Sequence, residues 1–331
     1  MRALTALFLL FFVCAQPAPV VAGPAMVFDV ESSKVLYAED PDMLWHPASL
    51  TKLMTVYLTF EALKAGKFTV DSKVTVSKRA FRQPPSKIGL PIGGQMSVKL
   101  AIDVLIIKSA NDVAVMLAEK VAGTETAFVA MMNKTAKRLG MSNSRYYNPN
   151  GLPDARQVTT ARDLALLSRA ILKDFPEHAP LFKQLDVKIG KRRLRTHNGL
   201  LRTFDGADGL KTGFICASGF NVVASATRDG RKLVAVVLGS LSSGKRTRRA
   251  SMLLSHSFDT YVWKALFASS VIETLPQDGS EAKGPINMRN KVPSCNRRAR
   301  KVRKKRRVKK KRKSKSKVKS KSKSKTKKKK S

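Results

Sequence analysis

The chain has 331 residues, 43% of them hydrophobic, and a formal net charge of +41. The length is enough for one large or two modest domains. Beyond the first residues no apolar run approaches a membrane-spanning length, so we expect the mature chain to be soluble or peripheral to a membrane.

The first 22 residues have the pattern of a secretory signal peptide. Arg2 supplies a short basic region, residues 3–15 are apolar, and residues 20–22 offer small side chains for cleavage. We therefore expect a mature chain that begins near Gly23 and acts in the periplasm or cell envelope, either free or peripheral to a membrane.

Two short strands are expected at the start of the mature chain, around a turn at residues 31–34. A helix is expected over residues 49–64, where apolar residues recur at a spacing of about 3.6. Three prolines and two adjacent glycines indicate a loop over residues 79–98.

Helices dominate the middle of the chain. Residues 98–123 are typical of two helices separated by a break at residues 108–111, and residues 124–140 of an amphipathic helix closed by a glycine. Residues 148–154 form a turn cluster, and a threonine cap begins another helix over residues 159–175.

The pattern changes to strands in the second half. We expect a strand over residues 209–218, a hairpin over 219–240 with its turn at 228–231, and a last helix over 248–267. Strands at both ends and helices between them predict an α+β fold whose sheet is built from distant segments.

Two segments without a core follow the expected domain of residues 23–270. Residues 271–296 lose apolar periodicity and are expected as a linker. Residues 297–331 hold 24 lysines and arginines and no acid, so we expect them to be disordered. The residues before this tail have 40 basic and 23 acidic side chains, a net charge of +17.

Three short strings carry the chemistry: Ser49-Leu50-Thr51-Lys52, Ser109-Ala110-Asn111 and Lys211-Thr212-Gly213. Each string alone is weak evidence for an active site, since Ser-x-x-Lys also occurs at residues 242–245. Their order and setting are specific, because the first begins a helix, the second lies in a helix break, and the third lies on a strand.

The first string explains a lysine within an apolar helix. Residues three apart share a helix face, so Ser49 Oγ and Lys52 Nζ can meet. A serine becomes a nucleophile when a base takes its proton, and burial beside the cation of Lys211 would lower the pKa of Lys52 enough for that task. The backbone N–H groups of Ser49 and Phe214 could form an oxyanion hole.

With these strings, the chain resembles the low-molecular-weight penicillin-binding proteins, which are serine D-alanyl-D-alanine carboxypeptidases. The segments that carry the resemblance are "PASLTKLMT", "KSANDVAVMLAE", "NPNGLPD", "GLKTGF" and "ASGFNVVASA", and it covers residues 23–267. It implies a penicillin-recognising serine peptidase fold, with an antiparallel sheet and a helical subdomain. It also implies cleavage of the terminal D-Ala from peptidoglycan stem peptides and sensitivity to β-lactams.

The resemblance also implies roles for single residues. The catalytic residues would be the nucleophile Ser49, the base Lys52 and the proton relay Ser109. The substrate-binding residues would be Asn111 for the amide, Gly213 and Phe214 along the strand, and, for the carboxylate, Lys211, Thr212 and Arg246. The turn cluster at residues 148–154 is interpreted as structural.

The chain also departs from the family pattern. Ile215 stands where many members have threonine. Neither the C-terminal β-domain nor the amphipathic anchoring helix of many members is recognised here, so anchoring of that kind is not carried over. A class A β-lactamase is disfavoured, because no Glu-x-x-x-Asn string lies between residues 148 and 211. A DD-endopeptidase, or an inactive wall-binding scaffold, remains the alternative.

No metal and no cofactor is expected, because the four histidines lack metal-ligand spacing. Cys216 and Cys295 could form a disulfide in an exported protein or remain two free thiols. The basic tail is a candidate for binding anionic lipid or an acidic wall polymer. Nucleic acid would also bind it in vitro, but export makes such a partner incidental in the cell.

Overall fold

The computed structural model describes residues 23–267, 270–277, 279 and 284–296. The expected signal peptide and basic tail lie outside these residues. Within them, no helix combines the length and the apolar character that crossing a bilayer would require.

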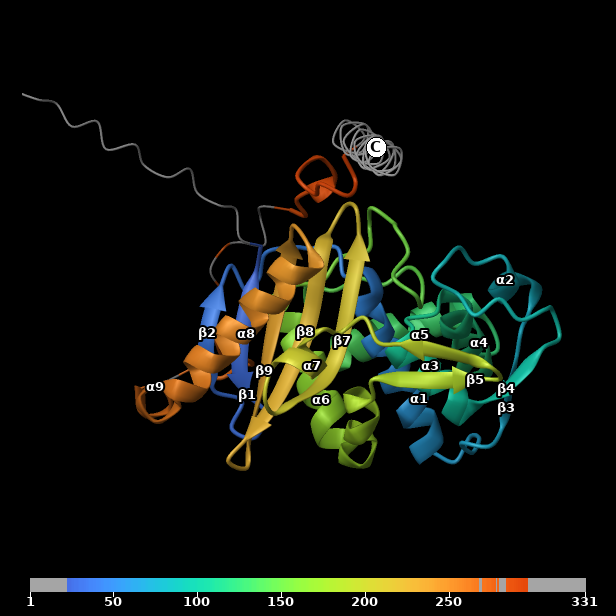
Figure 1. Ribbon diagram of the computed structural model, residues 1–331, viewed down its shortest axis with the longest axis horizontal. Coiled ribbons are helices and arrows are strands. Elements are labelled where there is room, and N and C mark those ends of the chain that lie inside the picture. Colours follow the sequence, from blue (N-terminus) through green and yellow to red (C-terminus); the bar gives the residue numbers. More distant parts are fainter. Residues whose placement is uncertain (1–22, 268–269, 278, 280–283, 297–331) are drawn as a thin grey trace, which may run out of the picture.

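A five-stranded antiparallel sheet forms one side of the molecule (Figure 1), with the strand order β2-β1-β9-β8-β7. The first strand of the chain therefore pairs with the last, and Ala25 lies opposite Val237. The strand bounds are β1 Ala25–Asp29, β2 Val35–Glu39, β7 Ala207–Ile215, β8 Gly219–Arg228 and β9 Arg231–Ser240.

The predicted hairpin is present as β8 and β9. Asp229 and Gly230 form its two-residue turn, with φ of 49° and 72°. Positive φ at both positions matches the twist of the flanking strands, which is why an Asp-Gly pair favours a hairpin here.

Helices cover both faces of the sheet. Side chains of β8 and β9 alternate between two cores: Val222 and Ala224 pack with α8 (Ser243–Asp259), whereas Val234 and Val236 pack with α6 (Ala161–Asp174). Because both faces are buried, these strands are almost continuously apolar.

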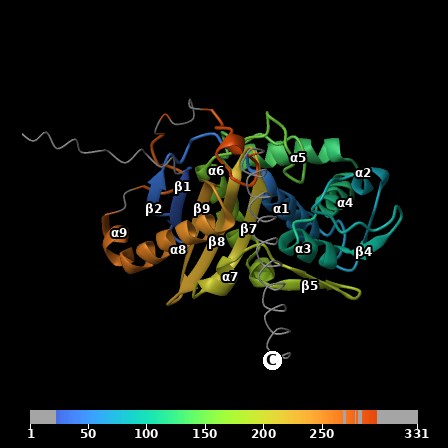
Figure 2. The ribbon, with the colours of Figure 1, turned by 45° about the horizontal axis from the view of Figure 1, so that its top comes forward.

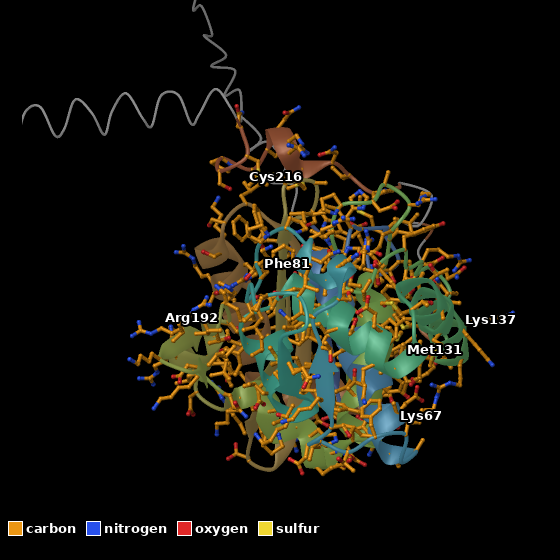
Figure 3. The ribbon with its side chains drawn as sticks, turned by 90° about the vertical axis from the view of Figure 1, so that its right-hand side faces the viewer. Lys67, Phe81, Met131, Lys137, Arg192 and Cys216 are labelled. Atoms are coloured by element: carbon orange, nitrogen blue, oxygen red, sulfur yellow. A yellow bond between two sulfur atoms is a disulfide. The ribbon has the colours of Figure 1, made fainter. Side chains whose placement is uncertain are left out.

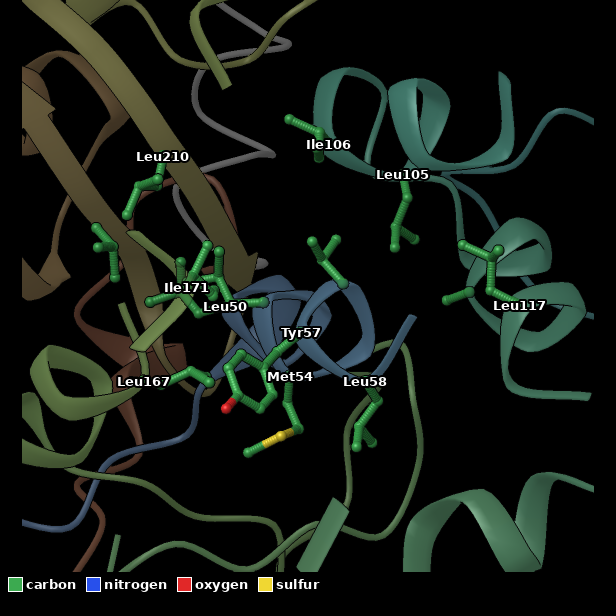
Figure 4. Close-up of a cluster of buried hydrophobic side chains, with 14 of the residues drawn as sticks. Leu50, Met54, Tyr57, Leu58, Leu105, Ile106, Leu117, Leu167, Ile171 and Leu210 are labelled. Atoms are coloured by element: carbon green, nitrogen blue, oxygen red, sulfur yellow. The ribbon is translucent and has the colours of Figure 1, made fainter. Parts of the chain in front are cut away.

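The helical subdomain lies beside β7, and α1 joins it to the sheet (Figure 2). Nearly every side of α1 is buried, and the helix contacts α3, α4, α5 and α6. The same core includes Leu210 of β7 (Figure 4). The bounds are α1 Thr51–Lys64, α3 Val98–Ile107, α4 Asn111–Ala122 and α5 Glu125–Arg138. The expected α+β architecture is confirmed.

Several local predictions differ from the structure. The last helix begins at Ser243 rather than 248, because the Ser242 hydroxyl caps it by accepting from the Lys245 N–H at 3.1 Å. It ends at Asp259, and a short helix, α9 (Tyr261–Phe267), follows. The sequence reading also missed six short elements: β3 Lys73–Thr75, α2 Lys78–Phe81, β4 Gln95–Ser97, β5 Asp186–Ile189, β6 Arg192–Arg195 and α7 Leu200–Thr203.

Residues 270–277 and 284–296, here called the C-terminal strap, pack against the domain although a linker was expected. Ile272, Met288 and Val292 are at most 1% exposed within the main core. Met288 and Val292 are four residues apart, but Ile272 lies 16 residues before Met288, so no apolar run long enough to predict a helix or strand marks their burial.

Two further contacts hold the strap. Arg162, which pairs with Asp42 at 2.6 Å in a buried ion pair, also donates to three strap carbonyls, those of Ile272, Leu275 and Pro276. At the other end of the strap, Cys295 forms a disulfide with Cys216. Of the two alternatives left open by the sequence, a disulfide or two free thiols, the structure has the disulfide. Cys216 lies beside the strap ribbon at the top of Figure 3.

Candidate active site

Ser49 lies where a 3-10 turn, Ala48–Leu50, runs into α1. Lys52 follows one turn later, and its Nζ is 3.0 Å from Ser49 Oγ. The predicted pairing of these two side chains across three residues is therefore present.

Lys52 is completely buried, with 0% of its surface exposed. Its Nζ donates to Asn111 Oδ1 at 2.9 Å and to the carbonyl of Asn150. Burial holds the pKa of Lys52 well below its usual value, and the charge of Lys211 lowers that pKa further. No carboxylate forms an ion pair with this amine among the described residues.

The second string occupies the break between α3 and α4, as predicted. Ser109 has a φ of 61°, which turns the chain and brings the hydroxyl toward β7. There its Oγ accepts a 2.8 Å hydrogen bond from Lys211 Nζ. Burial and the nearby Arg246 lower the pKa of Lys211 to about 7.

Asn111 begins α4 and is held on both sides. Its backbone N–H donates to Ser86 O at 2.7 Å, and its Nδ2 donates to Pro84 O at 3.0 Å. These bonds orient the amide so that Oδ1 faces Lys52. The next residue, Asp112, accepts from the backbone N–H groups of Ile88 and Gly89 and so fixes the same loop.

The third string lies on β7, which packs against the turn that carries Ser49. A Cβ on Gly213 would lie 2.9 Å from Pro47 O and 3.2 Å from Ser49 N, so only glycine permits this approach. Thr212 is buried, whereas Phe214 is 40% exposed and stacks on Phe220 with ring centroids 4.1 Å apart.

Arg246 lies in the first turns of α8 and is 4% exposed. It donates to the carbonyl of His197 at 3.1 Å, and its Nε has no hydrogen-bond partner in the part of the chain that the structure describes. Burial lowers the pKa of this guanidinium to about 10, so it stays a cation at neutral pH.

These groups meet around one pocket of about 680 Å³, which lies between β7 and the helical subdomain. Seven of the nine predicted site residues line it, while Lys52 and Lys211 lie just behind its wall, bonded to Ser49 and Ser109. The lining residues from the predicted set are Ser49, Ser109, Asn111, Thr212, Gly213, Phe214 and Arg246.

The sequence reading missed the contribution of the 148–154 turn. The carbonyl of Asn150 accepts from Lys52, and Asn150 and Gly151 line the pocket. A Cβ on Gly151 would lie 1.8 Å from Ala48 O, so this turn supports the backbone that carries Ser49. Its match to the family segment "NPNGLPD" was the available signal. His197, which also lines the pocket, had no such signal.

Among residues 23–267, 270–277, 279 and 284–296, no three potential metal ligands lie together. The pocket and its wall bring together a buried amine, two hydroxyls and several cations. This combination suits nucleophilic attack on a carbonyl compound that carries a carboxylate.

Known proteins resemble this chain in sequence and in structure. The D-alanyl-D-alanine carboxypeptidase DacC of Escherichia coli (strain K12) is 38% identical over 249 residues, which are 73% of this chain and 62% of that protein. The chain thus spans a little less than two thirds of that relative's length.

Penicillin-binding protein 5 from Haemophilus influenzae has a TM-score of 0.70 and 35% identity, covering 74% of this chain and 72% of its own. Cefotaxime-bound penicillin-binding protein D2 from Listeria monocytogenes has a TM-score of 0.66 and 31% identity, covering 73% of this chain and 100% of its own. These similarities confirm the expected penicillin-recognising serine peptidase fold.

The match to a family model agrees with these relatives. Residues 12–242 match peptidase family S11, described as D-alanyl-D-alanine carboxypeptidase, and the chain belongs to that family.

Proposed function

We propose that this protein is a D-alanyl-D-alanine carboxypeptidase that removes the terminal D-alanine from peptidoglycan stem peptides through an acyl-enzyme on Ser49. The observation that carries the proposal is the buried Lys52 amine, 3.0 Å from Ser49 Oγ, with its pKa lowered well below the usual value. The family and its curated carboxypeptidases support the same reaction class.

Lys52 acts as the general base in this proposal. A neutral amine keeps two N–H groups, which Asn111 Oδ1 and the Asn150 carbonyl accept, and its lone pair then faces the Ser49 hydroxyl. Ser49 passes its proton to Lys52 as Oγ attacks the carbonyl carbon of the penultimate D-alanine. The backbone N–H groups of Ser49 and Phe214 stabilise the negative charge that develops on the carbonyl oxygen.

Breakdown of this intermediate breaks the peptide C–N bond and leaves an ester on Ser49. The amine of the departing D-alanine takes up the proton that Lys52 received, and Ser109 relays it. Ser109 is suited to this role because Lys211 donates to its oxygen at 2.8 Å, which leaves its own proton for transfer. A water molecule, activated by Lys52, then hydrolyses the ester and restores the enzyme.

The cations account for a preference for a free carboxyl end. Arg246 is buried with an unpartnered Nε, and Lys211 and Thr212 lie on the neighbouring strand. A substrate carboxylate would supply the missing anion. Asn111 has one Nδ2 hydrogen on Pro84 O, so its second Nδ2 hydrogen is the one available to the substrate amide.

Labelling with a fluorescent penicillin tests the nucleophile. The wild type should form a stable adduct, since the family resemblance implies slow deacylation, and Ser49→Ala should form none. Ser242→Ala is the matched control, because Ser242 begins the other Ser-x-x-Lys string of the domain but serves as a helix cap. Labelling of Ser49→Ala, or rapid turnover of penicillin, would refute the assignment.

Product analysis separates carboxypeptidase from endopeptidase activity. The purified protein is incubated with an uncross-linked pentapeptide and with cross-linked muropeptides. Release of free D-alanine from the pentapeptide, with cross-linked dimers left intact, is the expected result. Cleavage of dimers at a comparable rate would favour the endopeptidase instead.

We further propose that the enzyme acts in the cell envelope and that residues 297–331 bind an anionic surface, either lipid headgroups or an acidic wall polymer. Each basic residue near an anionic membrane contributes about 1 kcal/mol, so a few of the 24 engaged together suffice for binding. Deleting the tail should preserve penicillin labelling and weaken co-sedimentation with anionic envelopes at low salt. Loss of labelling would show that the tail serves the catalytic domain itself.

A further inference from the structure

Helix α9 presents apolar side chains to solvent. Val262 is 70%, Trp263 69% and Leu266 72% exposed, the highest values among the large hydrophobic residues of the described part of the chain. Residues 262 and 266, and residues 263 and 266, are neighbours on a helix surface, so the three side chains share one face. Figures 1 and 2 both place α9 at the outer edge of the molecule, beside β2.

Three cations gather where α9 meets the sheet. Lys34 Nζ donates to Ala265 O at 2.6 Å, Lys264 Nζ donates to Leu36 O at 3.0 Å, and the Arg231 guanidinium lies 3.6 Å from the centroid of the Tyr261 ring. These charges have backbone carbonyls or an aromatic ring as partners, and none of the three forms an ion pair among the described residues. The nearby Asp29 carboxylate is buried, and it accepts from the Tyr261 hydroxyl.

We propose that the face formed by Val262, Trp263 and Leu266 docks on the surface of a bilayer that contains anionic lipid. Amphipathic helices bind membrane interfaces by placing their apolar face at the boundary between headgroups and acyl chains, with cations among the headgroups. Tryptophan favours this boundary because its ring is apolar and its N–H is polar. The three cations around α9 match anionic headgroups in charge.

A second copy of the chain fits this face less well. The residues before the tail carry a net charge of +17, so two copies would repel each other. An anionic bilayer attracts the same charge.

The two tryptophans provide a direct readout of docking. Trp45 is 1% exposed in the core and Trp263 is 69% exposed, so a change in emission on adding vesicles reports on α9. The experiment uses the complete processed chain and vesicles of phosphatidylcholine with or without phosphatidylglycerol. A salt concentration of about 0.5 M limits attraction by the tail, because screening then acts over only a few ångströms.

With phosphatidylglycerol vesicles, we expect a blue shift of Trp263 emission and quenching by lipids brominated on their acyl chains. The double variant V262S/L266S keeps the fluorophore but should bind on the order of tenfold or more weakly, because two apolar side chains no longer leave water. The control is Ile92→Ser, which removes a 53% exposed apolar side chain from the loop before β4, and it should bind as the wild type does.

Two results would overturn the proposal. If the protein pellets with the vesicles while Trp263 emission stays unshifted and unquenched, binding belongs to the basic tail alone. If the emission shifts with protein concentration in the absence of vesicles, and V262S/L266S abolishes that shift, the face joins copies of the chain instead.

Discussion

Replacing Gly151 with alanine tests whether the 148–154 turn positions the nucleophile. The new Cβ would lie 1.8 Å from Ala48 O and 3.0 Å from Ser49 N, whereas ordinary contacts begin near 3.4 Å. The backbone that carries Ser49 must therefore move by roughly 1.5 Å, and a misplacement of about 1 Å can lower a rate 100-fold. The residue also has a φ of 78°, which strains an L-residue by about 1 to 2 kcal/mol. Overpacking adds about 1 to 3 kcal/mol.

Gly140→Ala separates the strain from the clash. Gly140 has a similar φ of 75°, but its Cβ would meet only Leu166 Cδ1 at 3.8 Å. We expect Gly140→Ala to lose about 1 to 2 kcal/mol of unfolding free energy, from the strain alone, and to acylate normally. Gly151→Ala should lose about 2 to 5 kcal/mol in urea unfolding and should acylate with a fluorescent penicillin about 100-fold more slowly. Equal acylation rates in the two folded variants would refute the idea that this turn positions Ser49.

Three further predictions concern the base, the pocket charge and the strap. Lys52→Arg replaces the neutral amine with a permanent cation that cannot act as a base, so penicillin acylation should fall by about 10² to 10⁴. A smaller loss would point to another base. Lys211 loses its proton as pH rises through about 7, so kcat/KM for carboxylate substrates should decline above that pH. Lys211→Arg keeps the charge and should remove the decline. A decline that persists in the variant would belong to another group. The disulfide joins residues 79 apart, so its loss in C216S/C295S should lower the unfolding free energy by up to about 4 to 5 kcal/mol; an unchanged urea midpoint would contradict this.

The elements that could be predicted are those marked by a pattern within a short stretch of sequence, such as an apolar run, a turn pair or a helix cap. The β8–β9 hairpin follows from two valine-rich runs around Asp229-Gly230, and α6 from the Thr160 cap, whose hydroxyl accepts from the Asp163 N–H at 3.0 Å. The three strings could be identified because the first two lie at the start of a helix and in a helix break, and the third lies on a strand, each with a recognisable pattern. Their convergence around one pocket follows from the sheet order, which only the family resemblance could supply.

The missed features depend on contacts between distant segments. The strap is held by Ile272, Met288 and Val292, which are too few to form a periodic apolar run and are recognisable only once their burial is known. Asn150 acts through its backbone carbonyl, and because every residue has a carbonyl, the type of residue does not reveal this role. The early start of α8 follows from the Ser242 cap, a signal that the apolar pattern beginning further on obscured.

The pairing of β1 with β9 has a consequence for how the chain folds as it is made. Ala25 finds its partner Val237 only when more than 200 residues have followed it. Until then β1 and β2 form an isolated two-stranded hairpin, which is at best marginally stable in water. The bond from Cys216 to Cys295 and the burial of Met288 and Val292 come later still. The sheet can therefore be completed only after the last segments of the domain have been made, and such long-range pairing is slow. The apolar strands stay exposed to aggregation meanwhile, so the amount of active enzyme should depend on chaperones that hold the emerging chain.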